Sequence, residues 1–210
     1  MTHTRTRRAA LPTVNGAGAR RYRDPQFEEI AIKIFPGEHY VSDQPDEMLV
    51  TILGSCVAAC IRDPFLGIGG MNHFMLPEAN SAGWDTASDS MRYGNVAMER
   101  LVNDILARGG LRQRLEVKVF GGGNVMKGAT SNIGHRNADF VETYLVAENL
   151  PIAAHHLRGK LPRRVHYFPA TGRVLLLELQ RTERDALVEN ETSYKSRIQV
   201  EPVAGSVELF

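Results

Sequence analysis

Apolar and polar residues alternate along much of this chain in short runs, the pattern that β-strands produce when one face is buried. Turn signals such as Asp63-Pro64 and Thr171-Gly172 separate several of these runs. The pattern predicts strands within residues 28–35, 36–43, 47–53, 56–63, 67–77, 115–120, 152–157, 163–170 and 173–179.

Two segments follow a helical period instead. From about Ser90 the apolar residues recur at every fourth position, which is the stripe of an amphipathic helix. Its members are Tyr93, Ala97, Leu101 and Ile105. The pair Gly109-Gly110 predicts the end of this helix. A second helix is predicted over residues 135–150, with Phe140 and Tyr144 on its inner face.

The strands and helices mostly do not alternate along the chain, which predicts a layered α+β domain. We expect this domain to span residues 27–180. Residues 1–26 are rich in arginine and poor in large apolar groups, which predicts a disordered basic N-terminal extension. Residues 181–210 are charged and irregular, and we expect a peripheral C-terminal tail.

Composition narrows the function classes only slightly. Hydrophobic residues make up 43% and charged residues 23% of the 210 residues, as in ordinary globular proteins. The net charge of +1 divides into +6 over residues 1–23 and −5 over the rest, and a solvated extension explains the basic head better than a nucleic-acid arm. No run approaches about 20 apolar residues, so we expect no membrane insertion. Two cysteines without an export signal favour free thiols and a cytoplasmic location.

Both cysteines lie within one apolar stretch, at Cys56 and Cys60. In a strand their Cα atoms would be about 13 Å apart, beyond the roughly 7 Å that a disulfide can bridge. A zinc site with His73 would need a fourth ligand. The adjacent His155-His156 pair is a poor source, because neighbouring strand residues point to opposite faces.

The glycine-rich sequence FGGGNVMKG at 120–128 follows a predicted strand, as a phosphate-binding loop would. It lacks the GxxxxGK[ST] motif, because Lys127 precedes Gly128 and Ala129 follows. The GxGxxG spacing is also absent, since Met126 stands at the third glycine position. We therefore interpret the segment as a tight backbone bend.

Cys56 follows Gly54-Ser55 at the end of a predicted strand, where a sharp turn could present a side chain together with backbone N–H groups. A nucleophilic thiol needs a base close by. His73 is a candidate if segments 56–61 and 71–76 pair across the intervening turn. The spacing alone leaves two interpretations open: a Cys/His dyad, or a small buried cysteine that only fills the core.

At LGSCVAACIRDPFLGIGGMNHFMLPE the sequence resembles the CheD family of chemoreceptor glutamine deamidases. The resemblance continues through VKVFGGGNVMKG, NIGHRNADFVETYLVAENLPIAAHHL and RRVHYFPATGRVLL, in that order over roughly residues 30–180. The family block usually reads IGERN, whereas this chain has His135 in place of the glutamate.

The resemblance implies a hydrolase that deamidates glutamine side chains of chemoreceptor cytoplasmic helices, and that hydrolyses glutamate methyl esters. It implies Cys56 as the nucleophile, His73 as the base and Thr51 as a residue that orients the histidine. It implies an α/β/β sandwich similar to the catalytic domain of cytotoxic necrotizing factor, with no metal or organic cofactor. Some members of the family also bind a CheC-type phosphatase.

Two other functions compete with this one. The chain could be a non-catalytic chemotaxis module that docks receptors or a CheC-type phosphatase, with its basic head and its tail as contact segments. It could also be a cysteine protease or an acyltransferase that uses the same dyad on a backbone amide.

Overall fold

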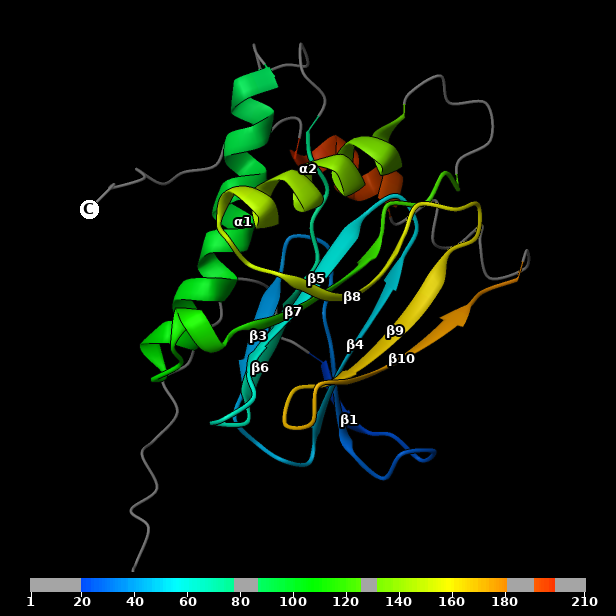
Figure 1. Ribbon diagram of the computed structural model, residues 1–210. Helices are drawn as coiled ribbons and strands as arrows, with labels where there is room; N and C mark the ends of the chain where they lie inside the picture. The colour runs from blue at the N-terminus through cyan, green and yellow to red at the C-terminus, as the bar shows by residue number, and fades with distance from the viewer. Residues whose placement is uncertain (1–19, 78–86, 126–131, 181–190, 199–210) are drawn as a thin grey trace, which may run out of the picture.

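The computed structural model describes residues 20–77, 87–125, 132–180 and 191–198. Two five-stranded sheets stack face to face, and two helices cover the outer face of one of them (Figure 1). The predicted α+β class and its layering are therefore confirmed. No helix in these ranges combines the length and the apolar character needed to cross a bilayer.

The first sheet, called sheet A, has the order β1-β2-β4-β9-β10, and the second, sheet B, has the order β3-β6-β5-β7-β8. The strands of sheet A are β1 (Arg20–Arg23), β2 (Ile30–Lys33), β4 (Glu47–Leu53), β9 (Arg163–Phe168) and β10 (Arg173–Glu178). Those of sheet B are β3 (His39–Ser42), β6 (Ile68–Asn72), β5 (Val57–Asp63), β7 (Glu116–Gly121) and β8 (Ile152–Leu157). The helices are α1 (Ala87–Ala107), α2 (Ile133–Ala147) and the short 3-10 helix η1 (Arg112–Arg114).

Strand β5 lies at the centre of sheet B and is buried on both faces. Val57, Ala59 and Ile61 face the layer of α1 and α2, whereas Ala58 and Cys60 face sheet A. A strand that is covered on both sides has no polar face, which explains why VAACI reads as a continuous apolar run rather than an alternating one. The two core clusters on either side of β5 hold the three layers together.

The ends of the domain differ from the sequence prediction. Within the extension expected to be disordered, Arg20–Arg23 form β1 and pair with β2 in antiparallel orientation. This strand carries no apolar alternation, and the pairing is supported by a 2.5 Å ion pair between Arg21 and the buried Glu47. Residues 1–19 lie outside the described residues.

Within the stretch 181–210 that was expected to be peripheral, residues 191–198 form a helix. Its Glu191, Tyr194 and Ile198 are buried against the domain. The sequence prediction of a peripheral tail therefore does not describe this helix. The rest of the stretch lies outside the described residues.

Candidate active site

Residues 54–56 carry the chain from β4 in sheet A to β5 in sheet B. Cys56 is the last residue of this crossing, and its side chain belongs to the core cluster between the two sheets. The thiol is completely buried, with 0% of the residue exposed. The turn predicted at Gly54-Ser55 is thus a crossing between sheets that sets Cys56 in the space between them.

His73 is brought to Cys56 by the pairing of β5 with β6. The two strands are antiparallel, and the ladder extends beyond β6 to a bridge between Val57 and Phe74, with 2.9 Å hydrogen bonds in both directions. In this register Cys56 lies diagonally opposite His73, and both side chains point toward sheet A. The predicted pairing of segments 56–61 and 71–76 is confirmed.

Thr51 reaches His73 from the opposite sheet. It stands on β4 between Leu49 and Leu53, whose side chains face the space between the sheets. The Thr51 Oγ1 atom lies 2.8 Å from His73 Nδ1 and 2.8 Å from the Ile34 carbonyl oxygen. The hydroxyl has one proton, which it donates to Ile34, so Nδ1–H of His73 donates to Thr51.

This network assigns the tautomer of His73. With the proton on Nδ1, the Nε2 atom carries a free lone pair and can accept a proton. His73 Nε2 is buried and makes no hydrogen bond within the described part of the chain. A cavity of about 40 Å³ adjoins His73 and is large enough for one water molecule.

A carboxylate from the C-terminal helix occupies the crossing between the sheets. Glu191 Oε1 accepts hydrogen bonds from the backbone N–H of Gly54 at 2.8 Å and of Cys56 at 3.2 Å. Glu191 Oε2 accepts from the Ser55 N–H at 2.9 Å and from the Ser55 hydroxyl at 2.7 Å. We call the three N–H groups of residues 54–56, together with the Ser55 hydroxyl, the N–H cradle.

The cradle is oriented from behind by two other segments. The Ser55 carbonyl accepts a 2.8 Å hydrogen bond from Asn137 Nδ2 on α2, and the Gly54 carbonyl accepts a 2.7 Å bond from the Gly123 N–H. In a trans peptide the C=O and the following N–H point in opposite directions. Holding these two carbonyls therefore turns the N–H groups of Ser55 and Cys56 toward Glu191.

The glycine-rich segment supplies close backbone approach rather than a phosphate site. Gly121 has φ +110°, and a Cβ atom there would lie 2.1 Å from the Cys56 carbonyl oxygen. The N–H groups of Gly122 and Gly123 are already bonded to the carbonyls of Cys56 and Gly54, each at 2.7 Å. The prediction of a tight bend is confirmed for residues 121–125, and residues 126–131 lie outside the described ranges.

Burial sets the protonation of both candidate residues. It raises the pKa of the Cys56 thiol well above its usual value, and the charge of Glu191 and the hydrogen bond to it raise that pKa further. Burial also lowers the pKa of His73 to about 4, although the charge of Glu191 acts in the opposite direction. With Glu191 in place, the pair therefore consists of a neutral thiol and a neutral imidazole.

The alternative roles of the cysteines find no geometric support. Cys56 and Cys60 are both free thiols. In the described ranges, no three histidine, cysteine or acidic side chains come together as a metal ion would require. Cys60 lies in the interior of β5, and burial raises its pKa beyond the usual range. It fills the core between the sheets, as a small apolar residue would.

Sequence reasoning brought together Cys56, His73 and Thr51, but it missed Glu191 and Asn137. Asn137 belongs to the IGHRN segment, which the sequence singled out without assigning it a task. Its amide also accepts a 2.9 Å bond from the Leu76 N–H, so it ties the end of the β6 segment to the cradle. No sequence signal points to Glu191, because it lies 135 positions after Cys56 in a charged stretch.

Comparison with known proteins agrees with the sequence resemblance. A family model described as CheD chemotactic sensory transduction matches residues 75–178. The probable chemoreceptor glutamine deamidase CheD of Rhodopseudomonas palustris (strain BisA53) is 80% identical over 191 residues, covering 91% of this chain and 89% of that protein. The protein of the same description from Methylobacillus flagellatus is 51% identical over 191 residues, with 90% and 94% covered.

Among solved structures, the crystal structure of Bacillus licheniformis hypothetical protein YfiH aligns with a TM-score of 0.33 and 12% identity. That alignment covers 59% of this chain and 50% of the other chain, a likeness too weak to carry an argument. The sequence relatives are much closer, and they match over about nine tenths of both chains. This chain therefore belongs to the CheD family.

Proposed function

We propose that this protein is a chemoreceptor glutamine deamidase that uses Cys56 as its nucleophile and His73 as its base. One observation carries the proposal. The 2.8 Å contact between Thr51 and His73 Nδ1 leaves Nε2 as the proton acceptor, on the same side of sheet B as the Cys56 thiol. The names of the relatives, all probable chemoreceptor glutamine deamidases, supply the substrate class.

The reaction begins with transfer of the Cys56 thiol proton to His73 Nε2. The thiolate then attacks the carbon of a glutamine side-chain amide and forms a tetrahedral intermediate with a negatively charged oxygen. The N–H groups of Gly54 and Cys56 converge on one point, where they can stabilise that oxygen. The Cys56 N–H is fixed through the bond of Asn137 to the Ser55 carbonyl, so it needs no reorganisation as charge develops.

Collapse of the intermediate breaks the carbon–nitrogen bond, and the imidazolium of His73 gives its proton to the departing ammonia. The acyl group is now a thioester on Cys56. A water molecule, deprotonated by the same imidazole, attacks the thioester and releases glutamate and the thiol.

Thr51 is a positioning residue in this scheme. It touches neither substrate nor thiol, and it holds His73 in the tautomer and the orientation that the base requires. The Ile34 carbonyl stands behind it and fixes the direction of the hydroxyl proton. A histidine with its proton on the other nitrogen could not accept the thiol proton at Nε2.

The finer features follow from the resemblance. We propose that the substrate glutamines lie on cytoplasmic helices of chemoreceptors, that glutamate methyl esters are also hydrolysed, and that the protein works in the cytoplasm. A CheC-type phosphatase is a candidate partner. The α/β/β layering agrees with a relationship to the catalytic domain of cytotoxic necrotizing factor, which also remains a prediction.

The test is mass spectrometry of a receptor cytoplasmic fragment incubated with wild-type protein, with Cys56→Ala and with Cys60→Ala. Wild type and Cys60→Ala are expected to convert glutamine to glutamate, and Cys56→Ala is expected to lose at least about 10³-fold in rate. Cleavage of the fragment would indicate a protease instead. Binding without any mass change would indicate a docking module. Full activity in Cys56→Ala would disprove the assignment of the nucleophile.

A further inference from the structure

Glu191 carries the same functional group as the product of the proposed reaction. A glutamate side chain has a carboxylate that accepts hydrogen bonds through both oxygens, and Glu191 places such a carboxylate in the N–H cradle. The proposed reaction forms the same carboxylate on a substrate side chain next to Cys56. Glu191 Oε1 lies 3.2 Å from the Cys56 nitrogen, and the charge of Glu191 raises the pKa of both Cys56 and His73.

The helix that carries Glu191 contacts the domain through one face. Its buried residues are Glu191, Tyr194 and Ile198, at positions i, i+3 and i+7, which share one side of a helix. Tyr194 and Ile198 join the same core cluster as Cys56. Ser193 and Ser196, on the other side of the helix, are exposed.

Tyr194 forms the second anchor of this face. Its hydroxyl lies 2.5 Å from the hydroxyl of Tyr93 on α1. Its ring covers Gly37, where a Cβ atom would stand 3.1 Å from the Tyr194 oxygen. The surface that this helix covers, between α1 and the 54–56 crossing, therefore holds a carboxylate at one position and an aromatic residue one turn later, and we call this surface the helix groove.

The helix packs against a site that is closed to solvent. Cys56 is 0% exposed and His73 is 2% exposed, so a side chain of another protein cannot reach either residue in this arrangement. Glu191 also keeps the pKa of the thiol raised. The arrangement is thus closed to a substrate, and its occupant contributes to keeping the nucleophile protonated.

We propose that helix 191–198 is an intramolecular product mimic, and that a substrate helix binds in the helix groove once helix 191–198 has left. The receptor segment that the site accepts presents glutamine at position i and apolar residues at i+3 and i+7. This inference rests on the proposed function, because it takes the N–H cradle as the site of the reacting amide. The C-terminal helix then acts as a competitive inhibitor of its own protein.

The experiment compares full-length wild type, Glu191→Ala and the matched control Ser193→Ala, which alters the exposed side of the same helix. The first readout is the rate of alkylation by iodoacetamide at Cys56, with Cys60 as an internal reference on the same strand. The second is the pair of kinetic constants for a receptor cytoplasmic fragment. Intramolecular competition reduces the fraction of open protein, and its removal raises apparent affinity by the same factor.

Glu191→Ala is expected to raise the Cys56 alkylation rate and to lower KM, each by at least about tenfold, with kcat within about twofold of wild type. Cys60 reactivity and all constants of Ser193→Ala should remain at wild-type values. If Glu191→Ala also exposes Cys60, Tyr194→Phe takes its place. That variant keeps the ring and loses only the bond to Tyr93, and it should accelerate alkylation of Cys56 alone by about threefold.

Three results would overturn the inference. An unchanged alkylation rate at Cys56 would mean that the helix does not gate the site. Faster alkylation with an unchanged KM would mean that the substrate binds elsewhere. A loss of kcat in Glu191→Ala would make Glu191 part of the catalytic machinery. Alkylation does not depend on activity, so a failure of the proposed function, seen as full activity in Cys56→Ala, is recognised separately.

Discussion

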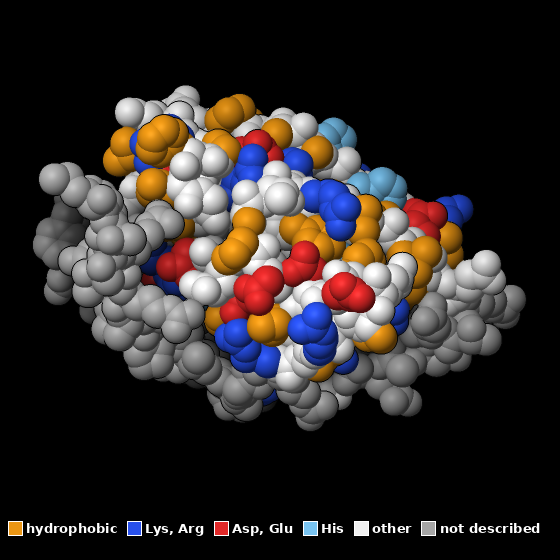
Figure 2. All heavy atoms as spheres, turned by 90° about the horizontal axis from the view of Figure 1, so that it is seen from below, with side chains coloured by type: hydrophobic (Ala, Val, Ile, Leu, Met, Phe, Trp, Pro, Cys, Tyr) orange, Lys and Arg blue, Asp and Glu red, His pale blue; other side chains and the backbone are white. Residues whose placement is uncertain are grey.

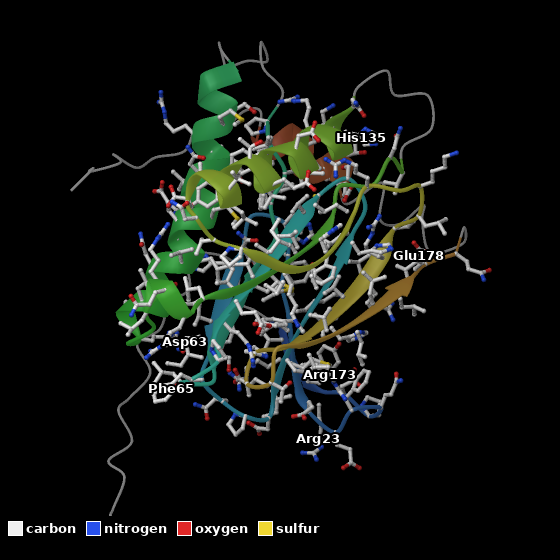
Figure 3. All side chains as sticks on the ribbon, in the orientation of Figure 1. Arg23, Asp63, Phe65, His135, Arg173 and Glu178 are labelled. Carbon is white, nitrogen blue, oxygen red and sulfur yellow. The ribbon has the colours of Figure 1, made fainter. Side chains whose placement is uncertain are left out.

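Two buried carboxylates lie at opposite ends of strand β5, and each accepts hydrogen bonds from backbone N–H groups. Asp63 terminates the strand at the end where Figure 3 labels it together with Phe65. Glu191 stands beyond the other end, where the chain crosses from β4 and where the C-terminal helix lies near α2 (Figure 1). The two sites have similar donors but are built in different ways.

Asp63 is bound by its own surroundings. Its Oδ1 accepts from the N–H of Phe65 at 3.0 Å, and its Oδ2 accepts from the N–H of Leu111 at 3.0 Å and from Arg114 at 2.6 and 2.8 Å. Burial alone would raise the pKa of Asp63. The hydrogen bonds from Arg114 and from the backbone outweigh that effect and hold the pKa below its usual value.

Glu191 comes from a segment 135 residues further along the chain than Cys56. In the described ranges no lysine or arginine forms an ion pair with it, and its neighbours are a thiol and an imidazole. Without a cation, this buried carboxylate is held by hydrogen bonds from the backbone N–H groups, the Ser55 hydroxyl and the Cys56 thiol. Asp63, paired with Arg114, is therefore a structural carboxylate. Glu191, which has no such partner in these ranges, is one that another side chain could replace in the N–H cradle.

The face of the molecule at the Asp63 end, as seen in Figure 2, has no large patch of acidic or of basic side chains alone among the described residues. Figure 2 views the molecule from that end, and acidic, basic and hydrophobic side chains are interspersed across the visible face. Phe65 is exposed there, with the Arg114 guanidinium 5.0 Å from its ring centre. The Asp63 end thus consists of a turn and its supports, and the proposed active site is at the other end of the strand.

The largest difference between the two carboxylate sites is expected when each carboxylate is replaced by its amide, as Glu191→Gln and Asp63→Asn. In Glu191→Gln the amide oxygen can take the bonds of Gly54 and Cys56. The NH₂ group can donate to the Ser55 hydroxyl, although it also faces the Ser55 N–H, whose bond is lost. If the cradle is the reacting site, Cys56 attacks this amide and hydrolysis returns glutamate at position 191. We expect purified Glu191→Gln to contain glutamate there, as measured by peptide mass spectrometry.

The matched control is Asp63→Asn, which should keep its amide because no nucleophile lies beside it. The double variant Cys56→Ala/Glu191→Gln should keep its glutamine for the same reason. If Glu191→Gln retains glutamine as fully as the double variant does, the product-mimic arrangement is wrong, and the two carboxylates would then be equivalent structural groups.

The second contrast is in stability. Asp63→Ala leaves Arg114 and several N–H groups without their partner, and it is expected to lower the free energy of unfolding by about 3–5 kcal/mol. Glu191→Ala should cost less than about 2 kcal/mol, because the cradle becomes hydrated once the helix leaves. Urea denaturation of both variants measures the difference. Equal losses at both sites would break the comparison.

The fold and the dyad could be predicted from the sequence to different extents. The strands of residues 47–53 and 56–63 could be recognised because alternation and continuous apolar runs report burial by neighbouring layers. The pairing that brings His73 to Cys56 follows from a short antiparallel connection. These features depend on residues close together in the chain, so the local sequence pattern is enough to predict them.

The features that could not be predicted depend on partners far apart in the chain. Helix 191–198 has three buried residues, too few to mark an amphipathic stripe within a charged stretch. The ion pair between Arg21 and Glu47 supports strand β1. From composition alone, these two residues would be expected to be separate charges exposed to solvent. Asn137 acts through a carbonyl 82 positions away, and nothing in its own surroundings indicates this bond.

The smallest expected effect is in the pH dependence of stability, where His73 and Asp63 should act in different pH ranges. The pKa of His73 is lowered to about 4 by burial, against an ordinary value of about 6.5. Between these values the unfolded chain binds a proton that the folded protein does not, so the free energy of unfolding falls as the pH decreases from 6.5 to 4. The loss is on the order of 3 kcal/mol. His166, whose pKa is also lowered by burial, adds to it in the same direction.

Asp63 contributes in a different window. Its folded pKa is depressed, so its stabilisation is complete above the usual carboxyl value of about 4 and is lost as the pH falls below that value. Denaturation of wild type, His73→Gln and Asp63→Asn at pH 7, 5.5, 4 and 3 would resolve the two windows. His73→Gln should flatten the change between pH 6.5 and 4, and Asp63→Asn should leave that part of the profile unchanged. If His73→Gln has the wild-type slope there, then His73 titrates normally and is not held as a neutral base beneath the C-terminal helix.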